Sequence, residues 1–561
     1  MNPLRSLWNF CRRSGAAMYW HVLNFSWRRA DYDTVEINLR GGVPERRLPG
    51  SLFELRRPAG LTHRGLLELL DYLASDDKVK RVILQLGPLG TGLARVQEIG
   101  RALDRLRAAG KTLIAQLDTV GLREYLLAAH CQQRVLLPNS LLLITGLRME
   151  IRYFRGLLDK LAVQPDLLVA GKFKNAAETF MRRDASEAAR EMTDGLLDDL
   201  YAQIVDELAR ALGKTPDQVR AIIDDGPYPP ERAVQAGLVD RLAYRDELLK
   251  QLEIKRERKI VGGQRYWHFR TKRDQTRAVM IDAPRVAVLY LSGTIREGRG
   301  DPSRGAPGAA VYVKLLRRLR REKKIRAVVL RINSPGGAAG GSDLIRREVQ
   351  NLAAKKTVLI SMGDVAASGG YMIAVGGKRL LAERATLTGS IGVIAGKFAI
   401  AGLLEKFGIG QEAYSRGAAA GLYSTSQPFS ELERQRMGEI IASSYKSFKA
   451  MVAESRGFEP ARIDELAEGH VWTGRQALEN KLVDLYGGIG DALREAKEAA
   501  GGRAGEPIRL IEVPALPSPW RLLWSMSSAR MSLPTELAEW VELQAFSGIP
   551  FAGLPFTVRI R

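Results

Sequence analysis

The chain has 561 residues, which is enough for two or more domains that each bury a hydrophobic core. Its hydrophobic content of 45% is ordinary for a globular α/β protein, and its net charge of +22 suits an anionic surface, although a solvated basic surface explains the charge equally well. Two cysteines exclude a disulfide framework, the five histidines lack metal-pair spacing and no nucleic-acid-binding motif occurs, so we predict no metal, no cofactor and no nucleic-acid partner.

Residues 1–30 form a basic and aromatic segment whose apolar part, residues 15–27, has arginines at both ends. About 13 residues are too few for a spanning helix, which needs ~20, and no small-residue cleavage site marks a signal peptide. Tryptophan and arginine in such a segment suit the surface of a membrane, which predicts a peripheral contact. A segment packed on the following domain explains the pattern equally well.

The remainder of the chain contains one domain twice. We place the first copy at residues 31–254 and the second at residues 284–503, because three segments match between them at offsets of 245, 246 and 244. Duplication on this scale indicates two structural units of about 220 residues each. The matching segments are 111–114 with 356–359, 157–160 with 403–406, and 236–240 with 480–484.

One lysine of the first copy has no counterpart in the second. At an offset of 246, Lys174 corresponds to Ala420. The apolar neighbours Phe173 and Phe180 fit partial burial, which disfavours an ammonium charge and lowers the pKa of a lysine. Lys172 is an alternative candidate for a lysine with a lowered pKa. A strand would place the side chains of both lysines on one side, whereas a helix would place them on different faces.

Residues 255–283 are basic, and we interpret them as a linker between the copies. In the second copy, apolar β-branched runs alternate with amphipathic helical patterns, which indicates a mainly parallel sheet. The predicted fold class is therefore α/β, with mostly parallel twisted sheets flanked by helices. The expected strands are 286–291, 327–332 and 357–362, and the expected helices are 311–321 and 343–354.

Ser368 follows the expected strand 357–362 and precedes a helical pattern that starts at Tyr371. A serine there can be a nucleophile, since the partial positive charge of a helix N-terminus stabilises an alkoxide, or merely an N-cap. At an offset of 246 it corresponds to Leu122, so only the second copy keeps the hydroxyl. A serine kept in one copy and a lysine kept in the other suggest one composite site.

A glycine pair follows another strand of the second copy. Gly336 and Gly337 come soon after the expected strand 327–332, where their backbone N–H groups can face a cleft. Together with the N–H of Gly369 they would form an oxyanion hole. An ordinary turn between a strand and a helix is the alternative.

The base of the composite site is not expected to be histidine. Only His470 lies within the second copy, in a structural context, so the composition disfavours a Ser-His-Asp triad and a neutral Lys174 is the candidate. The tail, residues 504–561, is rich in proline and tryptophan. We interpret it as a strap across the second copy or as an oligomer or membrane contact.

These motifs resemble the S49 serine peptidases, in the long, duplicated form called signal peptide peptidase A. The resemblance spans about residues 35–500 and implies a ClpP/crotonase-like fold in each copy. It implies that Ser368 is the nucleophile, that Lys174 is the general base and that Ser390 orients the lysine amine. Gly336 and Gly337 resemble the oxyanion loop. The segments that carry the resemblance are 334–337, 362–371, 387–392 and 469–474 in the second copy and 173–178 in the first.

The resemblance also implies a function: an endopeptidase that cleaves residual signal peptides and other unfolded apolar peptides through an acyl-enzyme. It implies a homotetramer associated with a bacterial inner membrane, although the clear spanning helix of long-form relatives is missing here. Two alternatives stay open. One is a crotonase-like acyl-CoA enzyme, and the other is a non-catalytic assembly that binds peptides or membranes.

Overall fold

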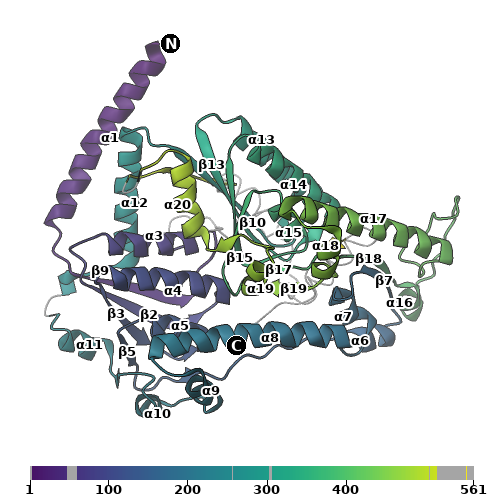
Figure 1. The fold of residues 1–561 in the computed structure, drawn as a ribbon, viewed down its shortest axis with the longest axis horizontal. Helices are drawn as coiled ribbons and strands as arrows, with labels where there is room; N and C mark the ends of the chain where they lie inside the picture. Colours follow the sequence, from purple (N-terminus) through teal and green to yellow (C-terminus); the bar gives the residue numbers. More distant parts are fainter. Residues whose placement is uncertain are drawn as a thin grey trace.

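The computed structural model describes residues 3–46, 60–254, 257–301, 306–503, 506–514 and 551–552. Each copy folds around a mostly parallel β-sheet covered by helices, and the two copies lie side by side (Figure 1). This arrangement confirms the predicted α/β fold built from a tandem duplication.

The sheet of the first copy has the strand order β8-β5-β3-β2-β1-β9, and all its neighbouring strands run parallel. Its central strands are almost continuously apolar, as is usual for a sheet covered on both faces. The strands are β1 (Thr34–Gly41), β2 (Arg81–Leu89), β3 (Thr112–Leu117), β5 (Gln133–Leu136), β8 (Arg241–Leu242) and β9 (Ile260–Gly262). The helices are α3 (His63–Ala74), α4 (Leu93–Ala108), α5 (Leu122–Ala129), α6 (Arg155–Lys160), α7 (Glu178–Met181), α8 (Glu187–Leu212), α9 (Pro216–Asp224), α10 (Pro230–Gln235) and α11 (Arg245–Gln251).

The sheet of the second copy repeats this order as β20-β16-β15-β13-β10-β21, with β17 and β19 added beside β15. The strands are β10 (Arg285–Ser292), β13 (Ile325–Ser334), β15 (Thr357–Ala367), β16 (Arg379–Ala382), β17 (Leu387–Gly389), β19 (Val471–Thr473), β20 (Leu485–Tyr486) and β21 (Arg509–Val513). The helices are α13 (Ala309–Arg321), α14 (Ala339–Ala353), α15 (Gly369–Ala374), α16 (Ala401–Lys406), α17 (Glu431–Arg456), α18 (Pro460–Leu466), α19 (Gly474–Glu479) and α20 (Ile489–Ala499). Strand β15 extends five residues beyond the expected end, because its last residues pair with β17.

Matching hydrogen bonds show that the duplication is structural. The hydroxyl of Tyr125 donates to the carbonyl of Leu238 at 2.8 Å, and the hydroxyl of Tyr371 donates to the carbonyl of Leu482 at the same distance. In the same way, the carboxylates of the two repeated aspartates accept N–H groups from equivalent strands, Asp240 from Arg134 and Asp484 from Leu380. The offsets of 246 and 244 read from the sequence therefore hold in three dimensions.

One apolar core continues from the first copy into the second. Leu66 and Leu70 of α3 belong to the same buried cluster as Val286 and Val288 of β10 and Ile489 of α20. Burial of this surface from water favours a fixed arrangement of the two copies.

A buried ion network crosses the same boundary. The guanidinium of Arg331, on β13, is 1% exposed and contacts Glu45 at 2.8 Å and Glu98 at 3.2 Å, both from the first copy. Arg95 of α4 contacts Asp364 at 2.5 Å, four residues before Ser368. The network ties β15, which ends one residue before Ser368, to the first copy.

The segment that we interpreted as a linker contains regular structure. It supplies β9 to the first sheet and a helix, α12 (Gly263–Met280), which packs against α1 (Pro3–Arg29). Trp27 stacks on Phe269 with ring centroids 4.4 Å apart, whereas the N-terminal part of α1 extends away from the body (Figure 1). Within the described ranges, no helix has both the length and the apolar character that a membrane crossing requires.

A smaller sheet joins the two copies. Strand β7 (Gln164–Ala170) of the first copy pairs antiparallel with β18 (Val393–Ala399) of the second. Two residues of the tail, β22 (Phe551–Ala552), lie between β18 and β14 (Gly337–Ala338). Most of the tail, including the tryptophans that suggested a strap or a contact surface, lies outside the described residues.

Removal of the Arg331 guanidinium should destabilise the protein strongly. Arg331→Ala would leave Glu45 and Glu98 buried without this countercharge, which typically costs about 3–5 kcal/mol. The matched control, Arg379→Ala, breaks the more exposed pair with Glu495 and should cost less than ~1 kcal/mol. Urea unfolding followed by circular dichroism measures both losses, and equal losses would contradict a special contribution from the buried network.

Candidate active site

The amine of Lys174 reaches from the first copy into the second. Its Nζ donates to Ser368 Oγ at 2.7 Å, to Ser390 Oγ at 2.8 Å and to the Ser390 carbonyl at 3.1 Å. Both serines are fully buried, and Lys174 is 2% exposed. The structure thus brings together three of the predicted site residues, although 194 positions separate Lys174 from Ser368.

The electrostatics of the site favour an uncharged amine. Burial lowers the pKa of Lys174 from 10.5 to about 7, because the surrounding protein solvates an ammonium group poorly. A substantial fraction of the amine is therefore neutral near pH 7 and able to accept a proton. The rival Lys172 is 61% exposed and lies 3.6 Å from Glu191, so its side chain faces solvent.

Ser368 sits at a strained turn between β15 and α15. Its φ of 54° and ψ of −115° are rarely adopted by a residue with a side chain, at a cost of about 1–3 kcal/mol. Its N–H donates to the Gly389 carbonyl at 2.7 Å, whereas its hydroxyl makes no capping bond to the helix. The N-cap alternative therefore does not describe this serine, whose hydroxyl faces the lysine.

Several residues around Lys174 have strained backbone conformations. Among the described residues, seven that are not glycine have positive φ, and three of them, Ser368, Ser390 and Glu468, surround Lys174. Such conformations persist only where the surrounding structure enforces them, and they cluster at functional sites.

The three predicted oxyanion donors differ in their surroundings. The N–H of Gly336 donates to Ser334 Oγ at 3.2 Å, so it is already engaged. Gly337 and Gly369 lie against each other, since a Cβ built on Gly369 would stand 3.1 Å from the nitrogen of Gly337 and 2.5 Å from Ser342 Oγ. The packing at Gly369 therefore leaves no room for a side chain, and the backbones of Gly337 and Gly369 lie close together.

Comparison with known proteins identifies the family of this fold and site. The family model described as "Peptidase family S49" matches residues 105–259 and, a second time, residues 350–503. The chain belongs to peptidase family S49. The double match confirms the duplication and the resemblance seen in the sequence, and it makes the protein a serine protease.

Three relatives match this chain over most of its length and over most of their own length. "Serine protease SPPA, chloroplastic" from Arabidopsis thaliana is 31% identical over 499 residues, which are 87% of this chain and 72% of the relative. "Protease 4" from Salmonella typhi is 32% identical over 76% of this chain and 70% of its own length. "Protease 4" from Haemophilus influenzae is 29% identical over 84% of this chain and 78% of its own length.

The first S49 copy lacks the serine and the glycine that follow β15 in the second copy. Leu122 occupies the position of Ser368 and is buried. Glu124 stands where the second copy has Gly370, and its carboxylate accepts the N–H groups of Leu89 at 2.7 Å and Gly121 at 2.9 Å. By the offset of 246, Leu89 lies in the counterpart of the Gly336 loop. The carboxylate therefore joins the counterpart of the Gly336 loop to the counterpart of the turn before Ser368.

Sequence analysis missed Glu468, which holds in place residues 171–174, the loop that carries Lys174 and is called the lysine loop below. Its carboxylate accepts the N–H of Lys172 at 2.8 Å and the hydroxyl of Tyr445 at 3.1 Å. Its carbonyl accepts the N–H of Phe173 at 2.7 Å. The next residue, Gly469, must be glycine, because a Cβ there would lie 2.6 Å from the backbone nitrogen of Lys174. A positive φ at a glutamate leaves no mark in the sequence, so no pattern could have revealed this contact.

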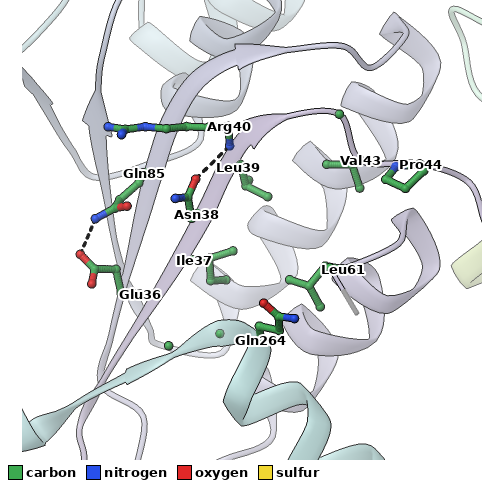
Figure 2. Close-up of a pocket in the computed structure, with 14 residues that line it drawn as sticks. Glu36, Ile37, Asn38, Leu39, Arg40, Val43, Pro44, Leu61, Gln85 and Gln264 are labelled. Carbon is green, nitrogen blue, oxygen red and sulfur yellow. Dashed lines mark hydrogen bonds between the residues drawn. The ribbon is translucent and has the colours of Figure 1, made fainter. Parts of the chain in front are cut away.

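A separate cavity of about 720 Å³ lies over β1 in the first copy (Figure 2). Its carboxylate, Glu36, accepts from Gln85 at 2.6 Å and pairs with Arg245 at 2.8 Å. None of the predicted site residues lines this cavity. The predicted serine and lysine lie instead at the boundary between the copies.

Glu468→Ala should lower kcat about 10- to 100-fold with little change in KM, because the loop would no longer hold the amine against Ser368. Glu468→Gln should keep most of the rate, since an amide oxygen can still accept the N–H of Lys172. Hydrolysis of casein, normalised to the serine titrated by a fluorophosphonate, measures both. Lys172→Ala is the control that keeps the backbone bond. A fall in the unfolding midpoint with unchanged kcat per labelled serine would indicate a purely structural role.

Proposed function

We propose that the protein is an endopeptidase in which Ser368 is the nucleophile and Lys174 is the general base. The observation that carries the proposal is the buried contact of 2.7 Å between Nζ and Oγ. The neutral amine takes the Oγ proton as Oγ bonds to the peptide carbonyl carbon, and it returns the proton to the leaving nitrogen as the C–N bond breaks. Water then attacks the acyl-enzyme, releases the acid and restores the Oγ–H group.

Neighbouring groups support each step of this cycle. Ser390 accepts two hydrogen bonds from the amine, through its hydroxyl and its carbonyl, which leaves the nitrogen aimed at Ser368. The N–H groups of Gly337 and Gly369 are proposed as donors to the oxyanion, where one donor typically contributes ~10²–10³ in kcat.

The proposed substrates are unfolded apolar peptides, including residual signal peptides. Strand β22 of the tail lies between β14 and β18, with Ala552 opposite Gly337. This pairing supports a site that takes an extended chain by adding it to a sheet edge, which requires an unfolded substrate and reads few side chains.

Contact with a membrane surface is also proposed. Met18, Val22 and Phe25 on α1 are more than half exposed, and the guanidinium of Arg29 lies 4.2 Å from the Phe25 ring centroid. Exposed apolar side chains beside arginines suit the headgroup region of an anionic bilayer. Such a contact would hold the peptidase near its apolar substrates.

Ser368→Ala and Lys174→Met should each lower the rate of casein hydrolysis by at least ~10³-fold, because each removes an essential partner in one proton transfer. Lys172→Ala is the matched control and should stay near the parent rate. A fluorophosphonate should label the parent but not Ser368→Ala. Thioesterase or hydratase turnover that survives Ser368→Ala would instead favour an acyl-CoA enzyme.

The pH dependence of kcat/KM should follow the protonation of the Lys174 amine. Because only the neutral amine accepts a proton and its pKa is about 7, kcat/KM should fall as the pH drops through about 7. The acidic limb should have a slope of one proton. Initial rates from about pH 5 to about pH 9 test this, and a flat profile across that range would contradict Lys174 as the base.

A further inference from the structure

A second cavity, of about 520 Å³, lies between β7 and α17. Its volume is within the range of ~300–1,000 Å³ that is usual for ligand sites. One wall consists of Leu168, Val169 and Ala170, three successive residues of β7. Because successive side chains of a strand point to opposite faces, this wall is the edge of β7 rather than one of its faces. We call the cavity the β7 groove.

The edge of β7 at the groove pairs with no described strand. β7 is the last strand in the sheet order β14-β22-β18-β7, and β18 occupies its other edge. An edge of this kind presents backbone N–H and C=O groups to another extended chain. Val169 adds an apolar side chain that is 42% exposed. An extended polypeptide can use both features, whereas an acyl chain can use only the apolar one.

Helix α17 forms the other wall of the β7 groove, and it packs on both β7 and β18 (Figure 1). The buried Ile441 gives this wall an apolar base. Gly438 and Ala442, one helical turn apart, keep the wall low, since a Cβ built on Gly438 would meet no atom within 4 Å beyond its own stretch of helix. The groove therefore has room for a chain that lies along β7.

Two lysines, Lys446 and Lys449, lie at the far end of the α17 wall. Lys449 pairs with Asp464 at 2.5 Å, whereas the exposed Lys446 has no ion-pair partner in the described part of the chain. A ligand with a carboxylate is therefore complementary in charge to this end of the groove. The equivalent helix of the first copy, α8, has no such face, because at the offset of 244 Asp194 and Asp198 replace the two small residues.

The β7 groove adjoins the elements that hold the lysine loop. Ala170, at the end of the β7 wall, directly precedes that loop. On the α17 wall, the hydroxyl of Tyr445 accepts the N–H of Glu468 at 3.0 Å and donates to its carboxylate at 3.1 Å. Neither Ser368 nor Lys174 lines the groove. A chain bound there would therefore lie next to the proposed active site without entering it.

We propose that the β7 groove binds a second segment of the unfolded substrate as an extended apolar strand, with a carboxylate near Lys446. The substrate role rests on the proposed function, whereas the binding does not. A strand beyond β7 would lie three strand spacings, about 14 Å, from the position of β22. A connecting segment of at least about five residues is needed to span this distance, so only a long unfolded chain can occupy both positions. Such a chain would be held at two places while one of its bonds is cleaved.

Fluorescence anisotropy with the full-length Ser368→Ala protein measures binding without catalysis. The first probe is a fluorescein-labelled peptide of alternating leucine and alanine that ends in aspartate, and the second has asparagine and a terminal amide in place of the carboxylates. Gly438→Trp should raise the Kd of both probes at least ~30-fold, because the indole would fill the groove. Lys446→Glu should raise the Kd of the acidic probe about 3- to 10-fold and leave that of the uncharged probe unchanged.

Gly195→Trp is the matched control for the binding measurement. Gly195 lies on α8, also with open space around it, so this variant should keep the parent Kd. Circular dichroism checks that every variant is folded. An unchanged Kd in Gly438→Trp would overturn the proposal. Tighter binding of decanoate than of the unlabelled peptide would also overturn it, because the groove would then be a lipid site.

The substrate role of the groove is tested with variants that keep Ser368. Gly438→Trp should raise the ratio of KM for casein to KM for a fluorogenic tetrapeptide about 10-fold, because only the long chain reaches the groove. Gly195→Trp should keep the parent ratio. An equal shift of both KM values, or the parent ratio in Gly438→Trp, would overturn the role of the groove in substrate binding. A parent protein without hydrolysis would instead contradict the proposed function, and the binding measurement would still decide whether the groove takes a peptide.

Discussion

The antiparallel pairing of β7 with β18 is the constraint on which the rest of the structure depends. It carries a strand of the first copy across the boundary and ends at Ala170, four residues before Lys174. The turn that contains Glu468 and Gly469 then holds the lysine loop against the second copy. The lysine reaches Ser368 because the sheet fixes its loop from one side and the turn fixes it from the other. A site assembled in this way exists only when both copies are folded and docked.

Burial is what makes a lysine useful in this position. An exposed amine stays protonated at pH 7 and cannot act as a base, whereas the buried amine of Lys174 has a pKa of about 7. Desolvation is the cause, so the shift depends on apolar packing around the amine rather than on a neighbouring cation. The proposed chemistry therefore depends on burial, and the strained conformations of Ser368, Ser390 and Glu468 persist because the surrounding structure enforces them.

The sequence alone was sufficient to predict the residues of this site that differ between the two copies. Ser368 and Lys174 stood out because each is missing from the other copy, and the apolar strand patterns predicted the parallel sheets. Tertiary contacts that leave no periodic signal were not predictable. The extension of β15 depends on pairing with β17, and the engagement of Gly336 depends on the rotamer of Ser334. Glu468 acts through partners in the other copy and on a distant helix, so only coordinates could reveal it.

Duplication explains why one copy could lose its site without loss of the fold. Once β7 delivers a lysine to the neighbouring copy, the position of Lys174 in the second copy is free to become Ala420. The serine position of the first copy can likewise become Leu122, and Glu124, at the position of Gly370, accepts the N–H groups of Leu89 and Gly121. Buried N–H groups without acceptors are costly, so these two hydrogen bonds stabilise the first copy at this position. The two copies thus keep one scaffold and divide the proposed site between them: the first supplies the lysine and the second supplies the serine.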